Sequence, residues 1–360
     1  MKPEPTVAIS ASRLKTCMEC SWKYHSKYKL KLPDTTNDGA SRGTVCHAVL
    51  EVLGKKGRKK YYNKIVKEQD VFSVPSVGRL VTALATKLNV SDPDNMELIN
   101  FMTVNGLCHD YFGEDKEKPN LSFSEKSFDI SINKKGKRYR ILGFIDKLFL
   151  YKGKKAALVR DFKTSKKVFE GKEVSDNLQD LVYSLAVKHL YPDYSFRESE
   201  FLFLKFELGH DLLGHANEGV LRMEALTDDE LEGFEYQLTE WQSYLENFDE
   251  DSARSNFALD KGFPAKEEGF SGKLLCGFAK YPGQLKKDGT VMWHCPFKFA
   301  FDYYSLKDKE GNTRKNAFIE DRGFLEDLLE DGDTIEKLRY DGCPPHQPSS
   351  TGEMDDEFDF

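Results

Sequence analysis

Apolar and polar positions alternate with a period of two in five segments of the chain, which is the pattern of β-strands. These segments are residues 121–132, 139–151, 156–163, 200–208 and 218–226. Residues 44–112 have helical spacing instead, and Asp92-Pro93-Asp94 is typical of a helix start within them. The pattern predicts an α/β protein with a mixed central sheet, flanking helices and a helical insertion at about residues 52–118.

Two more helices are predicted after the third strand. Asp176 or Asn177 is a candidate N-cap for a helix over residues 178–186, which we expect to pack across the sheet. Residues 227–230, Thr-Asp-Asp-Glu, form a capping box. The apolar residues that follow it at helical spacing are typical of ordinary core contacts.

The second and third strands bring two carboxylates together. If Gly153-Lys154 is a two-residue hairpin loop, Asp146 lies opposite Asp161, with Cβ atoms about 4.5–5.5 Å apart. Lys163 projects from the same face. Apolar residues share that face: Leu142, Phe144, Leu148, Leu150, Ala157 and Val159. Buried carboxylates so close repel each other unless a cation neutralises them, so the spacing indicates a divalent metal site, with a solvated charged hairpin as the equal alternative at this point.

Two residue pairs at helical spacing flank this hairpin in the sequence. His47 and Glu51 are four residues apart, as are Gln179 and Tyr183, so each pair can lie on one helical face. Taken alone, His47 has the alternative of a hydrogen-bonded core histidine. Gln179 and Tyr183 have the alternative of a simple buried hydrogen bond.

Together these residues form an ordered series of motifs. His-x-x-x-Glu, Gly-x-x-Asp, Asp-x-Lys-Thr and Gln-x-x-x-Tyr begin at His47, Gly143, Asp161 and Gln179. The series resembles the RecB-type branch of the PD-(D/E)XK nucleases, which includes RecB and AddB nuclease domains, CRISPR-associated adaptation nucleases and bacteriophage exonucleases. The resemblance covers roughly residues 8–207 and includes an opening segment similar to residues 9–14 and 20–24.

The resemblance implies a Mg²⁺ or Mn²⁺ ion and a set of ligands for it. They are His47, Asp146, Asp161 and the backbone carbonyl of Phe162. Glu125 matches an acidic position of the family, and its implied role is a second-shell group or a ligand of a second metal ion. One imidazole plus oxygen atoms suits either ion. Such an ion polarises the phosphoryl group and lowers the pKa of its bound water.

The resemblance also implies roles for three neighbouring side chains. Lys163 would orient the attacking water and stabilise the charge that builds on the phosphorane. Gln179 and Tyr183 would position the backbone phosphate or that water. These three are the predicted catalytic residues.

In fold, the resemblance implies a restriction-endonuclease-like core. In activity, it implies a metal-dependent DNA nuclease, and we expect an exonuclease of recombination, repair or bacteriophage DNA metabolism. Two alternatives stay open: a structure-specific endonuclease, and a non-catalytic DNA-binding adaptor that recruits partners. The intact Asp146, Asp161 and Lys163 argue against the adaptor, because a retired site has no reason to keep a mutually repelling pair.

Composition narrows the class of protein. No apolar run is long enough to span a bilayer, and the first residues do not form a signal peptide. Seven cysteines, an odd number, indicate a reducing cytoplasm rather than a disulfide framework. We therefore expect a cytoplasmic protein with no membrane partner.

The net charge of −7 is unevenly distributed along the chain. Residues 1–67 carry 15 Lys and Arg against 5 Asp and Glu, whereas residues 353–360 carry five carboxylates and no base. A basic segment with aromatic residues suits a phosphate track with stacking platforms for DNA, although a solvated surface has the same composition. The candidate DNA-binding residues are Arg13, Trp22, Lys23 and Arg42.

The cysteines allow a second metal site. Several RecB-like nucleases hold a 4Fe-4S cluster with one cysteine before the histidine motif and three near the C-terminus. Cys17, Cys20, Cys276 and Cys295 are the candidates here, and four thiolates suit such a cluster or Zn²⁺. Ala279 stands where a Cys-x-x-Cys pair would need its second cysteine, so buried apolar thiols remain the alternative. Cys46, Cys108 and Cys343 are predicted to be structural.

The end of the chain differs in composition from the rest. Residues 343–352 are typical of a flexible linker, and residues 353–360 form an acidic tip that ends in Phe360. The tip resembles those by which single-stranded-DNA-binding proteins recruit partners, but a disordered solubilising tail has the same composition. The predicted organisation is a nuclease domain over 1–260, a closing segment over 261–342 and a disordered acidic tail over 343–360.

Overall fold

The computed structural model describes residues 3–35, 37–115, 117–208, 219–260 and 275–347. The predicted acidic tip lies outside these residues. The chain divides into two compact units, of which the first contains residues 1–12 and 36–247 and the second contains residues 13–35 and 248–360. This division differs from the predicted boundary at residue 260, because the segment 13–35 groups with the C-terminal part of the chain. No helix of the described residues is both long and apolar enough to cross a membrane.

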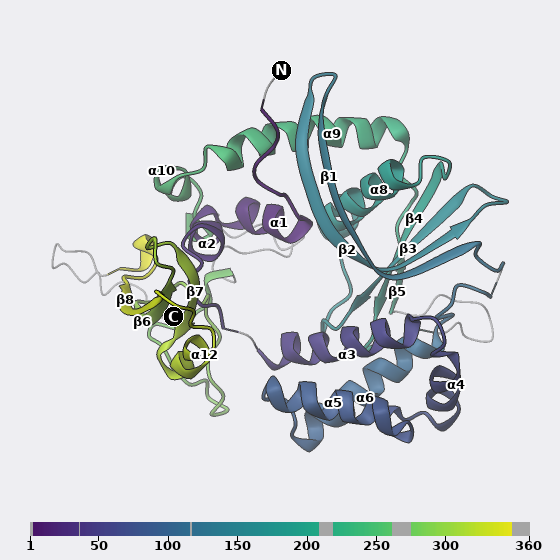
Figure 1. Cartoon of the computed structure of the whole chain (residues 1–360), viewed down its shortest axis with the longest axis horizontal. Coiled ribbons are helices and arrows are strands. Elements are labelled where there is room, and N and C mark those ends of the chain that lie inside the picture. Colours follow the sequence, from purple (N-terminus) through teal and green to yellow (C-terminus); the bar gives the residue numbers. More distant parts are fainter. Residues whose placement is uncertain (1–2, 36, 116, 209–218, 261–274, 348–360) are drawn as a thin grey trace. The chain divides into compact units, whose positions relative to one another are not determined.

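The first unit contains a five-stranded sheet of order β1-β2-β3-β4-β5 (Figure 1). Only β3 and β4 are parallel, so the sheet is mixed, as predicted. The strands are β1 (Leu121–Lys134), β2 (Lys137–Tyr151), β3 (Ala156–Lys163), β4 (Phe196–Phe203) and β5 (Val220–Arg222).

Hairpin turns set the register of the first three strands. Lys135 and Gly136 both have positive φ, which suits the tight turn between β1 and β2. β2 and β3 are joined by the four residues Lys152–Lys155 rather than by two, but Tyr151 still pairs with Ala156. The predicted register is therefore confirmed, and it continues to Lys147 opposite Arg160, one pair before the two aspartates.

Helices cover the sheet of the first unit (Figure 1). The insertion between residue 36 and β1 is helical, as predicted, with α3 (Asp38–Gly54), α4 (Lys59–Glu68), α5 (Pro75–Lys87) and α6 (Pro93–Cys108), and a 3₁₀ turn, η2 (Val71–Ser73). Asp92 caps α6 through the backbone N–H of Asn95. α3, α5 and α6 bury a continuous apolar cluster that also contains Phe162 and Leu202 from the sheet. This packing fixes α3 next to the ends of β3 and β4.

The remaining helices of this unit are α7 (Lys172–Ser175), α8 (Leu178–Leu190) and α9 (Asp228–Glu246). Both predicted caps are confirmed: the Asn177 side chain accepts from the backbone of Gln179, and Thr227 and Glu230 form a reciprocal capping box. α8 lies against β1 to β4. Gly143 permits close packing under it, because a Cβ at this position would lie 2.7 Å from the ring of Phe128.

The second unit combines the segment 13–35 with the C-terminal part of the chain. Its helical pieces are α1 (Ala11–Glu19), α2 (Ser21–Tyr24), a π-helical turn η1 (His25–Lys29), α10 (Glu250–Arg254), α12 (Arg322–Glu326) and the 3₁₀ turns Ala258–Asp260, Ile319–Asp321 and Pro344–His346. Its antiparallel sheet has the order β7-β6-β8, with β6 (Phe301–Lys307), β7 (Thr313–Phe318) and β8 (Thr334–Tyr340). Asn256 joins the two sequence segments by donating to the carbonyls of Cys17 and Met18.

Candidate active site

Three strands and one helix bring the acidic groups of the first unit together. Glu125 on β1 stands at the position opposite Asp146, between the pairs Ser124–Lys147 and Lys126–Ile145. The β2–β3 register places Asp161 opposite Asp146 on the other side. The backbone N–H of Phe162 donates to Asp146 Oδ2 over 2.7 Å and so joins the two strands at this point. The result is a row of three carboxylates across adjacent strands.

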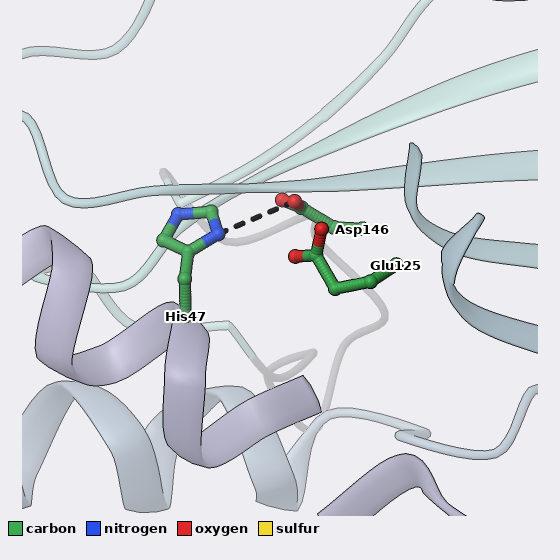
Figure 2. Close-up of side chains that lie close together, drawn as sticks. All are labelled: His47, Glu125 and Asp146. Atoms are coloured by element: carbon green, nitrogen blue, oxygen red, sulfur yellow. Dashed lines mark ion pairs between the residues drawn. The ribbon is translucent and has the colours of Figure 1, made fainter. Parts of the chain in front are cut away.

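His47 faces this row from α3. Its Nδ1 lies 3.2 Å from Asp146 Oδ1 (Figure 2). Ligand atoms of His47, Glu125 and Asp146 all lie within 4.8 Å of one another, and they are the only such group among the residues described. The predicted metal ligands His47 and Asp146 are therefore adjacent, and Glu125 is an equal member of the group rather than an outlying one.

Glu125 has a strained backbone. Its φ is +50°, a left-handed conformation that is uncommon for a residue with a side chain and more so in the middle of a 14-residue strand. Strain of this kind costs about 1–3 kcal/mol and is found most often at functional sites. Here it accompanies a carboxylate that is turned toward Asp146 and His47 (Figure 2).

Asp161 is buried, with 3 % of its surface exposed, and is held from two sides. Its Oδ1 accepts a 2.5 Å hydrogen bond from Gln179 Nε2, and its Oδ2 lies 2.5 Å from Lys163 Nζ. Oδ2 has no hydrogen-bond donor in good geometry. Burial raises the pKa of Asp161, against the opposing charges of Lys163 and His47. A buried carboxylate oxygen of this kind is suited to a cation.

Gln179 connects the predicted catalytic side chains. Besides donating to Asp161, its amide donates to the hydroxyl of Tyr183 over 2.8 Å, and its Oε1 accepts from Lys163 Nζ over 2.6 Å. Gln179 and Tyr183 are one turn apart on α8, as predicted. The structure thus brings Lys163, Gln179 and Tyr183 together beside the carboxylates.

The donor set fits a Mg²⁺ or Mn²⁺ ion. The group of His47, Glu125 and Asp146 offers one imidazole nitrogen and carboxylate oxygens, and Asp161 on the neighbouring strand adds a further carboxylate. Carboxylate oxygens are the hard ligands that these ions prefer. Such an ion supplies Lewis-acid activation of a phosphoryl group and of water. The backbone carbonyl of Phe162 stays a predicted ligand.

In the metal-free site, the pKa values of His47 and Glu125 are both shifted upward. Burial alone lowers the pKa of His47, but the hydrogen bond and charge of Asp146, with Asp161 and Glu125, outweigh it and raise that pKa to about 9. Burial and the charge of Asp146 raise the pKa of Glu125 to about 7. Both groups therefore hold protons near neutral pH that a metal ion must displace.

We expect the affinity for Mg²⁺ to rise with pH in two stages. Below pH 7 both His47 and Glu125 lose a proton on binding, so the dissociation constant should fall by about a hundredfold per pH unit; between pH 7 and 9 only His47 does, which gives about tenfold per unit. Calorimetric titration from pH 6 to 9.5 measures this. In Glu125→Gln only His47 loses a proton on binding, so the dissociation constant below pH 7 should change by about tenfold rather than a hundredfold per pH unit. An affinity for Mg²⁺ that does not depend on pH would contradict the assignment of His47 and Glu125 as ligands.

Comparison with known proteins agrees with this geometry. Residues 8–258 match the family model of the PD-(D/E)XK nuclease superfamily. The chain belongs to this superfamily. Its fold is accordingly the restriction-endonuclease-like α/β core that the motif series implied, and superfamily membership implies a metal-dependent nuclease.

Comparisons with curated proteins and with solved structures add no further assignment. No curated protein that was compared matches the chain. Among the solved structures that match is one titled "Crystal structure of SSO0001", with 14 % identity, a TM-score of 0.29, and coverage of 69 % of this chain and 79 % of the other.

A second candidate site lies in the second unit of this PD-(D/E)XK protein. A pocket is lined by four cysteines from four separate segments: Cys20, Cys276, Cys295 and Cys343. Cys17, predicted as a ligand, is buried in α1 and does not line the pocket, whereas Cys343, predicted to be structural, does. The lining of the pocket therefore differs from the predicted set by Cys343 in place of Cys17.

The cysteine pocket holds a neutral thiol beside a buried cation. Burial, together with the neighbouring Cys20 and Cys276, raises the pKa of Cys295 to about 11, so the free thiol keeps its proton at neutral pH. The ammonium group of Lys298 donates to the carbonyls of Gly277 and Ala279, and it interacts electrostatically with three of the pocket cysteines. A thiolate-bound metal would release the thiol protons, and Lys298 would offset part of the resulting negative charge.

The predicted DNA-binding residues are divided between the two units. Arg42 belongs to the first, whereas Arg13, Trp22 and Lys23 belong to the second. Trp22 has 6 % of its surface exposed and donates through Nε1 to the hydroxyl of Tyr340. The prediction of Trp22 as a stacking platform is wrong, because the indole is buried. Arg13 lies over the ring of Tyr28, and Lys23 lines the cysteine pocket.

Proposed function

We propose that the protein is a Mg²⁺- or Mn²⁺-dependent DNA exonuclease of the RecB-like branch, acting in recombination, repair or bacteriophage DNA metabolism. The observation that carries the proposal is the group of His47, Glu125 and Asp146 beside the buried pair of Asp161 and Lys163. The RecB-like assignment and the preference for DNA ends rest on the motif series from His47 to Tyr183.

The residues present can divide the reaction among them. The carboxylates and His47 would hold the ion, which would supply Lewis-acid activation of the scissile phosphate. Lys163, fixed by Gln179 and Asp161, stands where it can orient the attacking water and stabilise charge on the phosphorane. Tyr183 and Gln179 restrain one another, so the positioning groups are ordered before substrate binds.

A nucleic-acid substrate is supported by the charge of the insertion. The connection after α3 and the helix α4 carry exposed cations, of which three are held by carboxylates: Lys55 by Glu51, Lys59 by Glu114, and Lys67 by Glu68. Four more exposed cations have no ion pair among the described residues: Lys56, Arg58, Lys60 and Lys64. Exposed cations without carboxylate partners are typical of surfaces that bind phosphate backbones.

The activity and the preference for ends are tested on DNA of different topology. End-labelled single- and double-stranded linear DNA and circular single-stranded DNA are incubated with Mg²⁺ or Mn²⁺, with an EDTA control. We expect linear DNA to be degraded, the circle to be spared, and EDTA to stop the reaction. Cleavage of the circle would instead identify an endonuclease, and binding without cleavage of any substrate would identify the adaptor.

The cysteine pocket supports a second cofactor, and we propose an iron–sulfur cluster bound by Cys20, Cys276, Cys295 and Cys343. No three of these sulfur atoms lie within 4.8 Å of one another among the described residues, whereas Zn–S bonds of about 2.3 Å would bring sulfurs to about 3.8 Å apart around one tetrahedral ion. Four thiolates also suit a larger polynuclear centre such as a 4Fe-4S cluster, which does not need sulfur atoms this close together. Its expected role is to join α2 to the C-terminal segments of the second unit.

A further inference from the structure

Three cations gather at one edge of the sheet, outside the metal-ligand group. β3 and β4 are parallel neighbours, with Lys163 beside Phe203. Lys166 follows the end of β3 by three residues and Lys205 follows the end of β4 by two. Parallel strands end at the same edge, so both lysines emerge there.

The third cation reaches this edge from α3. Gly43 abuts the residue after β3, because a Cβ on Gly43 would lie 2.7 Å from Thr164 Oγ1. Arg42 immediately precedes Gly43 and has only 12 % of its side chain exposed. Its Nη1 donates to Asn95, but its buried Nε has no hydrogen-bond partner in the structure. Arg42 therefore keeps an unused donor close to the ends of β3 and β4.

The three cations are near enough to repel one another. Partial burial lowers the pKa of Lys205, and the charges of Arg42 and Lys166 lower it further. Of the groups that act on Lys205, only the sulfur of Cys46 opposes this shift, and no carboxylate does. Among the described residues, the ion pair of Arg42 is with Asp38, at 4.0 Å and largely exposed, and Arg42 also attracts the charge of Asp92. Such a cluster costs folding energy in the free protein and is stabilised when an anion binds.

We propose that Arg42, Lys166 and Lys205 form a binding site for a phosphate group of the nucleic-acid strand, next to the phosphate that is cleaved. The inference rests on the proposed nuclease function and adds a substrate contact to it. Arg42 precedes His47 by five residues on α3, which is about 7.5 Å along the helix axis.

The phosphate has two sources with the same chemistry. One is an internal phosphodiester, which carries one negative charge; the other is a terminal phosphate, which carries about 1.5 to 2 charges at neutral pH. A site that prefers the terminal group would make the enzyme select phosphorylated ends. A site for the internal group would bind the strand whatever its end.

The test is the binding of three oligonucleotides that differ only at their ends: 5′-phosphate, 3′-phosphate or hydroxyl at both. Binding is measured by fluorescence anisotropy in EDTA, where no cleavage occurs, for the wild type and for Lys166→Gln with Lys205→Gln. Lys87→Gln is the matched control, because Lys87 is an exposed lysine at the end of α5. We expect the double variant to bind about tenfold or more weakly and to lower the salt dependence by about one unit per lost phosphate contact.

The three oligonucleotides distinguish a terminal phosphate from an internal phosphodiester. Loss of binding confined to a phosphorylated end assigns the site to the terminal phosphate, and equal loss for all three oligonucleotides assigns it to an internal one. Affinity and salt dependence equal to those of the wild type in every arm would overturn the inference. The melting temperature should not fall in the double variant, since its substitutions relieve repulsion, so weaker binding would not reflect unfolding.

The failure of this site differs from failure of the nuclease function. If the wild type binds DNA through Lys166 and Lys205 but cleaves no DNA with Mg²⁺ or Mn²⁺, the phosphate site is supported and the nuclease function is contradicted. If the wild type cleaves DNA but the double variant binds DNA as tightly as the wild type, the nuclease function is supported and the phosphate site is contradicted.

Discussion

Replacing Lys163 by Ala should lower the rate of DNA cleavage by about a hundredfold to a thousandfold while changing DNA affinity by only a few fold. The lysine lies 2.5 Å from Asp161 and 2.6 Å from Gln179, so its charge is fixed beside the carboxylates before substrate arrives. Removing one preorganised group that stabilises developing charge has effects of this size. The measurement is single-turnover cleavage of labelled linear DNA with saturating Mg²⁺.

Asp161→Asn provides a companion variant with a different signature. The amide keeps an oxygen that can accept from Gln179, but it removes the negative charge that a metal ion needs. We expect loss of both cleavage and metal affinity. Because burial raises the pKa of Asp161, the neutral residue should leave the free energy of unfolding of the metal-free protein unchanged or increase it.

The controls for these two variants use the same chain. Lys87→Ala should cleave DNA at the wild-type rate, because Lys87 lies on α5 away from the carboxylate row. Near-normal cleavage by Lys163→Ala would contradict the role given to Lys163. A stable but equally inactive Lys87→Ala would show that the assay does not report on the site.

The second large effect concerns the cysteine pocket. If the proposed iron–sulfur cluster is present, Cys343→Ser should abolish it and Cys17→Ser should retain it, because Cys343 lines the pocket and Cys17 does not. Protein purified without oxygen is assayed for iron and acid-labile sulfide, which we expect to fall from about four of each per chain to nearly none in Cys343→Ser. The melting temperature of this variant should fall as well, since the cluster joins distant segments.

These two cysteines form a matched pair, because both are buried and both become serine. Equal loss of cluster from both variants would indicate damage to the fold rather than loss of a ligand. Full iron and sulfide in Cys343→Ser would contradict the ligand set. Zinc in place of iron in the wild type would retain the site and change its metal.

Much of the active site could be predicted because it depends on local order. The alternation of β2 and β3 and a short connection fixed Asp146 opposite Asp161, although the connection has four residues rather than two. The helical spacing of Gln179 and Tyr183 likewise predicted a shared face. One expectation from the same pattern was wrong: Phe144, expected to be buried beside Asp146, is 58 % exposed.

Features that depend on distant contacts or irregular backbone were harder to predict. The place of Glu125 among the metal ligands depends on a left-handed residue within a strand, which a period-two pattern does not reveal. Cys343 lies in a segment whose Pro-rich composition is typical of a linker, and only the folded second unit places it beside Cys20. Trp22 was assigned to DNA because aromatic residues stack on bases, but its partner Tyr340 is 318 residues away.

The most direct test of the account is the position of a metal ion in crystals. Crystals grown with Mn²⁺ are measured at the manganese absorption edge, and an anomalous difference map locates the ion. We predict a peak within coordination distance, about 2.1–2.3 Å, of His47, Glu125 and Asp146, with Asp161 adjacent. A clear peak elsewhere with this site unoccupied, or no peak at a Mn²⁺ concentration that supports DNA cleavage in solution, would contradict the assignment of these residues as the catalytic metal site.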